Sequence, residues 1–301
     1  MQGATKIICS YRQPLRLHQE ALKGRTLWMM LVPLTMLVGG CDRTDLVAVQ
    51  NFASVSQQAT AQFPDLAADI YGSCVRAAQF ESELPTQQKV QQRCGQFKQL
   101  APTLIAANKV LEEYLFALGT LATDQTVTYG PTLAELAQSV QANTSFQPAQ
   151  VKAASGILGF LLEAQAGRYR QQQVQAAIAA TNTDLNVLIP ALKAIIGQDY
   201  TRLLLIEEQT MAAYYRSKIS TGKEQLLLVA VIKNQWQDQR TTLAQKKAAV
   251  AAYIEILDQI AAAHQQLYND RGRLSSQETI QVIVQYARTL QPLMKNLVKA
   301  F

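Results

Sequence analysis

Apolar side chains at helical spacing recur along most of this chain and limit what it can fold into. In the clearest row, after a first gap of seven, the residues alternate steps of four and three, which places them on one helix face. The row comprises Leu243, Val250, Ile254, Leu257, Ala261, His264 and Tyr268. No stretch of comparable length shows the period-two alternation that is typical of β-strands. The pattern therefore predicts amphipathic helices and no sheet.

Two further rows have the same spacing. One comprises Leu185, Ile189, Leu192, Ile196 and Leu203, with Met211, Tyr214 and Tyr215 further along the same stretch. The other comprises Ile280, Ile283, Ala287, Leu290, Met294, Leu297 and Phe301. Each row needs a helix of several turns, so the second half of the chain is predicted to consist of long antiparallel helices.

Start and break signals divide the helical pattern into elements. Three Ser/Thr-x-x-Glu segments match the capping box: Thr132 to Glu135, Thr221 to Glu224 and Ser275 to Glu278. Pro102 and Pro148 are predicted to lie in the first turns of helices. Breaks are predicted at 124–131, 143–148, 220–223 and 269–276. We therefore predict an all-α, elongated multi-helix bundle of about seven or eight antiparallel helices.

The N-terminal region is organised like a secretory signal. Five cationic side chains precede an apolar run, Thr26–Val38, and two glycines follow it. The run is shorter than the roughly 17–25 residues that a membrane-spanning helix needs, and Pro33 interrupts it. We expect residues 1–40 to be removed. Translation from Met1 or from a later codon near Leu22 gives the same mature chain.

The segment Val38-Gly39-Gly40-Cys41 resembles the lipobox of bacterial lipoprotein precursors. The resemblance implies cleavage between Gly40 and Cys41, a diacylglycerol on the Cys41 thiol, and acylation of the new N-terminal amine. Each buried methylene contributes about 0.8 kcal/mol, so one acyl chain anchors marginally whereas two or three hold firmly. The implied partner of Cys41 is therefore membrane lipid, and the mature chain faces the periplasm.

The residue after the lipidated cysteine bears on which membrane holds the anchor. In lipoprotein precursors of enteric-like bacteria an aspartate at this position tends to retain the protein at the inner membrane, and here that residue is Asp42. Arg43 follows at once and partly neutralises it. The resemblance therefore favours the inner membrane over the outer membrane.

Cys74 and Cys94 flank a short segment, 81–85, that is predicted to turn between two helical stretches. The turn would fold the stretches back antiparallel, and an exported chain meets an oxidising compartment, so we predict a Cys74–Cys94 disulfide. A metal site is disfavoured because His264 is the one histidine after the signal and neither Cys-x-x-Cys nor His-x-x-x-His occurs. A catalytic thiol would lack a base.

Charge gives no indication of a nucleic-acid partner. Residues 1–40 contain five of the 28 Lys and Arg and one of the 22 Asp and Glu, so the remaining chain carries a net charge of +2. Its tightest basic clusters, 246–247 and 271–273, have no interleaved aromatic residues.

The mature chain is long enough to bury a sizeable core. We expect a first part, 41–170, with the disulfide, and a long-helix part, 171–301, packed together as one unit.

Candidate catalytic groups are sparse. Glu112-Glu113 and Glu207-Glu208 are adjacent pairs, and neighbours on a helix point about 100° apart, so they do not face each other as acid and base. Ion pairs are expected instead, for instance of Glu207 or Glu208 with Arg202. A di-iron site needs Glu-x-x-His, which His264 lacks. We predict no metal ligands, cofactor or catalytic residues.

These observations favour a lipid-anchored, non-enzymatic envelope protein that serves as a helical scaffold or binds an unidentified envelope protein. The alternative is an envelope hydrolase that acts on cell-wall material with Glu207 or Glu208 as its acid. That alternative requires one of the two glutamates in a concave pocket, partly buried and away from any arginine or lysine.

Overall fold

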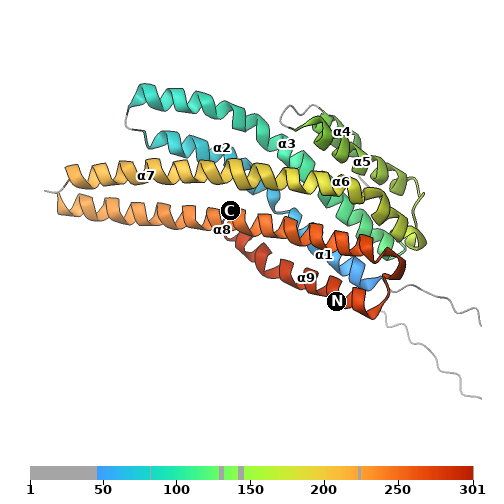
Figure 1. The fold of residues 1–301 in the computed structure, drawn as a ribbon. Helices are drawn as coiled ribbons and strands as arrows, with labels where there is room; N and C mark the ends of the chain where they lie inside the picture. Colours follow the sequence, from blue (N-terminus) through green and yellow to red (C-terminus); the bar gives the residue numbers. More distant parts are fainter. Residues whose placement is uncertain (1–45, 82, 129–131, 142–145, 223–224, 301) are drawn as a thin grey trace, which may run out of the picture. The chain divides into compact units, whose positions relative to one another are not determined.

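The structure is a computed structural model that describes residues 46–81, 83–128, 132–141, 146–222 and 225–300. Gly40, Cys41 and Asp42, and with them the predicted cleavage, lipidation and sorting residues, lie outside these ranges. All regular structure within them is helical, which confirms the all-α prediction (Figure 1). The helices of these ranges pack together as one compact unit.

Nine α-helices and three short helical turns make up the regular structure of the described ranges. The α-helices are α1 (Val47–Thr60), α2 (Phe63–Gln79), α3 (Leu84–Ala122), α4 (Thr132–Gln141), α5 (Pro148–Gln165), α6 (Val174–Ala194), α7 (Thr201–Thr221), α8 (Leu226–Asn269) and α9 (Gln277–Val298). The short turns are η1 (Gln171–Gln173), η2 (Ile195–Tyr200) and η3 (Arg271–Arg273). Because η2 is a π-turn that joins α6 to α7 without a break, these elements form eight continuous rods in the described ranges.

Successive helices pack as antiparallel hairpins. α2 packs on α3, α7 on α8, and α8 on α9, while α1 lies against α3 and α9 (Figure 1). Phe63 of α2 stacks on Tyr253 of α8, and Asp69 of α2 binds Lys246 of α8. The numbering falls along α8 as it rises along α2, so these two helices are also antiparallel. α1, which precedes α2, therefore lies toward the C-terminal end of α8.

The core draws side chains from every α-helix of the described ranges. The residues of the predicted rows lie in the core or pack against it as expected, except for Phe301, which is outside the described residues. On α8 a neighbouring row that the sequence pattern did not single out is also deeply buried: Ala249, Tyr253, Ile256, Ile260, Ala263 and Leu267. The buried face of α8 is thus wider than one stripe, because α1, α2, α6, α7 and α9 all contact it.

Three local predictions were wrong. Pro102 lies inside α3, whose first turn instead contains Pro85. An internal proline typically costs about 3 kcal/mol or more, so the buried residues that surround it in α3 must outweigh that cost. Thr221 ends α7, and its hydroxyl donates to the carbonyl of Ser217 instead of capping α8. At α9 the capping residue is Ser276, one position later than predicted.

Candidate functional site

α2, α7 and α8 meet at a buried cluster of charged side chains, which we call the Asp69 cluster (Asp69, Ser73, Arg76, Tyr200, Glu207 and Lys246). Asp69 Oδ1 accepts hydrogen bonds from Arg76 Nη1 and Lys246 Nζ, both at 2.7 Å. Asp69 Oδ2 accepts one from the Tyr200 hydroxyl at 2.6 Å. Tyr200 belongs to the π-turn η2. The carboxylate of Asp69 thus binds three side chains that come from α2, η2 and α8.

Opposing effects set the ionisation of Asp69. Burial alone would raise the pKa of its carboxyl group, but hydrogen bonds from Arg76, Lys246 and Tyr200 stabilise the charged form and hold the pKa below its ordinary value. The same surroundings raise the pKa of the Tyr200 hydroxyl, first through burial and then through the negative charge of Asp69. The carboxylate is therefore charged and the phenol neutral throughout the neutral range.

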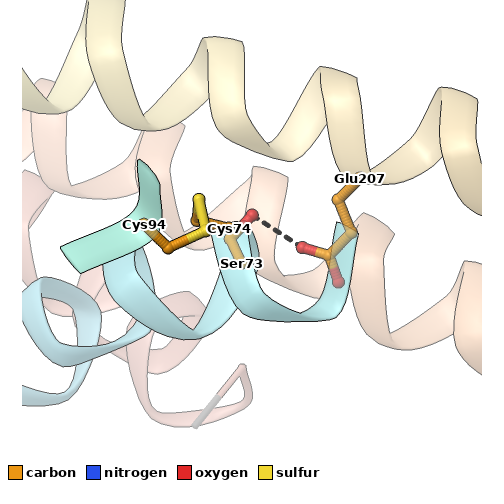
Figure 2. Close-up of a disulfide and its surroundings, with 4 residues drawn as sticks. All are labelled: Ser73, Cys74, Cys94 and Glu207. Carbon is orange, nitrogen blue, oxygen red and sulfur yellow. Dashed lines mark hydrogen bonds between the residues drawn. A yellow bond between two sulfur atoms is a disulfide. The ribbon is translucent and has the colours of Figure 1, made fainter. Parts of the chain in front are cut away.

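Glu207 completes the Asp69 cluster on α7. Its carboxylate accepts from the Ser73 hydroxyl at 2.7 Å (Figure 2). It also accepts from Arg76 Nε at 2.6 Å, and the residue is only 4 % exposed. A general acid would have to reach a substrate, whereas this carboxylate is covered and neutralised by an arginine. The condition that the hydrolase alternative placed on Glu207 is not met.

The other predicted carboxylates are also in ion pairs. Glu208 is exposed and binds Lys247 at 2.6 Å. The predicted pairing of Glu207 or Glu208 with Arg202 was wrong, because Arg202 binds Asp199, three residues earlier on the same rod. The adjacent Glu112 and Glu113 share Lys109, at 2.7 and 3.1 Å.

The predicted disulfide is confirmed. Cys74 of α2 and Cys94 of α3 are bonded, with their Cα atoms 5.7 Å apart, and the turn between Gln79 and Leu84 folds the two helices back on each other. Figure 2 shows the bond beside Ser73 and Glu207. The disulfide therefore fixes α3 to the same stretch of α2 that carries the Asp69 cluster.

His264 is buried, as its place in the α8 row predicted. Its Nε2 accepts from the Tyr114 hydroxyl at 2.7 Å, and its Nδ1 donates to Asn182 Oδ1 at 3.2 Å. Both ring nitrogens are thus used by one neutral tautomer. Burial lowers the pKa of the imidazole to about 4.

The lowered pKa of His264 predicts acid destabilisation. An unfolded histidine has a pKa near 6.5, so between pH 6.5 and 4 the unfolded chain binds a proton that the folded chain does not, and stability falls as pH falls. Lowering the pH from 7 to 5 should cost about 2 kcal/mol through this residue. Urea unfolding at both pH values should show this loss of stability in the wild type. In His264→Gln the loss between pH 7 and pH 5 should be smaller by about 2 kcal/mol. An equal loss in both chains would contradict the assignment.

The first turns of α8 carry large apolar side chains that nothing in the described structure covers. Leu226 and Leu227 are each 81 % exposed, Val231 is 56 % exposed and Leu228 is 45 % exposed. We call these four residues the α8 apolar face. A helix that is apolar on all sides is normally buried on all sides. The first turns of α8, however, are covered by α7 on one side only. No charged side chain occurs from 225 to 232 to make this face soluble.

Aromatic residues support this end of the α7–α8 hairpin. Tyr215 of α7 stacks on Trp236 of α8 with ring centroids 6.0 Å apart, and Phe80 at the end of α2 contacts Tyr214 at 5.7 Å. Lys218 lies over the Tyr214 ring at 5.3 Å. Aromatic packing between α7 and α8 therefore fixes the part of α8 that follows the α8 apolar face. Tyr214, Tyr215 and Trp236 act here as packing residues.

The α8 apolar face and the start of α1 lie toward opposite ends of α8 (Figure 1). α8 has 44 residues, which at about 1.5 Å each span about 66 Å. The uncharged run was visible in the sequence, but only the structure shows that no other described helix covers it.

We also searched the described part of the chain for metal-binding groups and membrane-spanning helices, and compared the chain with known proteins. No three or more histidine, cysteine or acidic side chains are grouped there so that they could hold a metal ion. No helix there is long and apolar enough to cross a membrane. No protein-family model, curated protein or solved structure matches the chain significantly.

Proposed function

We propose that this chain is a lipid-anchored, non-enzymatic protein of the bacterial envelope that presents the α8 apolar face to another envelope protein. The exposure of Leu226, Leu227 and Val231 carries the proposal, because large leucines left open at two adjacent positions are typical of interaction surfaces. The lipobox ending in Cys41 supports the anchor, and Asp42 favours the inner membrane.

The geometry supports a role as a spacer. Leu46 follows Cys41 by five positions, so the chain between them can span at most about 18 Å. The α8 apolar face lies toward the other end of α8, several tens of ångströms away. A bundle that stood upright on its anchor would hold this face off its own membrane. The disulfide and the Asp69 cluster stiffen the intervening helices.

The partner is expected to offer an apolar helical surface. Leu227 and Val231 are one turn apart on α8 and project from the same face, which suits pairing with an amphipathic helix through i, i+4 contacts. Because 225–232 carries no charge, the contact would depend on apolar burial and would persist at high salt.

A single in-cell experiment tests the anchor and the face. A photo-reactive residue at Leu227 is expected to give a discrete adduct that is lost in Leu226→Asp/Val231→Asp, while the same residue at Ala262, exposed further along α8, gives none. In the same cells, palmitate should label the chain, and Cys41→Ala or globomycin should leave an unprocessed precursor. Equal adducts from both positions would refute the docking face, and absence of palmitate would refute the anchor.

A further inference from the structure

α1 and α9 border a surface groove of about 550 Å³. Its apolar lining consists of Val55 from α1 and Met294 and Val298 from α9, and the amides of two glutamines also line it. Pockets that take small molecules usually measure about 300–1,000 Å³. The α1–α9 groove thus has the size of a ligand site, and it is separate from the α8 apolar face.

The charge at the α1–α9 groove is entirely positive. Lys295 in the last turn of α9 and Lys299, just past its end, line it about one helical turn apart. None of its lining residues is acidic, and the described part of α1 contains no charged residue at all. Neither lysine forms an ion pair with another described residue. An apolar floor beside two available ammonium groups suits a molecule with an apolar body and an anionic end.

We propose that the α1–α9 groove binds a long-chain fatty acid. The hydrocarbon chain would lie on Val55, Met294 and Val298, and the carboxylate would accept hydrogen bonds from Lys295 and Lys299, whose flexible stems let the ammonium groups reach it. A nucleotide or sugar is disfavoured because no aromatic side chain lines the groove for stacking. The proposal rests on this groove alone and is independent of the docking role of α8.

Fluorescence of cis-parinaric acid, displaced by oleate, measures the binding on the full chain. Lys295→Glu/Lys299→Glu is expected to weaken oleate about tenfold, since partly exposed ion pairs contribute up to about 1 kcal/mol each and reversal adds repulsion. Val298→Glu should weaken it as well. Lys295, Lys299 and Val298 are all exposed, so these variants should keep the fold, as unchanged circular dichroism melts would show.

Matched controls separate the groove from the apolar N-terminal run, which every variant retains. Val282→Glu changes another exposed valine of α9 outside the groove, and Lys233→Glu/Arg240→Glu repeats the charge change on α8. Both should bind oleate like the wild type. Neutral oleyl alcohol should bind about tenfold more weakly than oleate. The proposal is wrong if oleate does not bind below its self-association concentration, if the groove variants match their controls, or if the alcohol binds as tightly as the acid.

Discussion

Asp69→Ala is expected to lower the free energy of unfolding by about 3–5 kcal/mol, the usual cost of removing one partner from a buried ion pair. The side chains of Asp69 and Lys246 are only 12 % and 11 % exposed, so the ammonium would lose the carboxylate of Asp69 where little water can replace it. Arg76 would keep Glu207 but lose its paired contact with Asp69. Urea unfolding at pH 7, followed by circular dichroism, measures the loss.

Two further variants distinguish ion pairing from packing. Asp199→Ala breaks the pair with Arg202, whose side chains are 45 % and 67 % exposed, and should cost less than about 1 kcal/mol. Lys246→Met in the Asp69→Leu background should recover part of the stability lost in Asp69→Leu, because it removes the buried charge that Asp69 no longer balances. A cost for Asp69→Ala no larger than that for Asp199→Ala would show that the Asp69 cluster contributes little to stability.

Loss of the disulfide is expected to cost about 3 kcal/mol. The two cysteines are 20 residues apart in sequence, and closing a loop of that size removes about this much conformational freedom from the unfolded chain. Cys74→Ala/Cys94→Ala should therefore melt at a lower temperature than the oxidised wild type while remaining helical, since the core extends through every described α-helix. Thermal unfolding by circular dichroism measures the shift.

Reduction provides the internal control for this comparison. A reductant should lower the melting temperature of the wild type toward that of Cys74→Ala/Cys94→Ala and leave the double variant unchanged. Mass spectrometry should detect alkylation of both thiols only after reduction. Alkylation of Cys74 and Cys94 without reductant would contradict the bond.

The long helices could be predicted from the sequence because their signals are local. The rows of α8 and α9 repeat every three or four residues, and the four predicted breaks coincide with the gaps between helices. The disulfide could also be predicted, since the short turn near Glu83 brings Cys74 and Cys94 together without any knowledge of the rest of the fold.

The Asp69 cluster could not be predicted, because its members meet across the fold. Glu207 binds Arg76, 131 residues away, whereas sequence reasoning could search only nearby residues and named Arg202. Pro102 was misassigned for a related reason. A proline signals a helix start locally, but the packing of α3 on its neighbours keeps the helix continuous through it.

The π-turn between α6 and α7 has a consequence for how this chain can vary in length during evolution. A π-turn closes its hydrogen bond over five residues instead of four, so it holds one residue more than an α-turn. Deleting one residue within Ile195–Tyr200 would let regular α-helix replace it and leave both flanking helices facing the core, at the expense of the contact from Tyr200 to Asp69. Deleting one residue between Tyr200 and Glu207 would instead rotate Glu207 by about 100° away from Arg76. The rod from Val174 to Thr221 therefore has a place that can lose a residue without turning its buried faces outward.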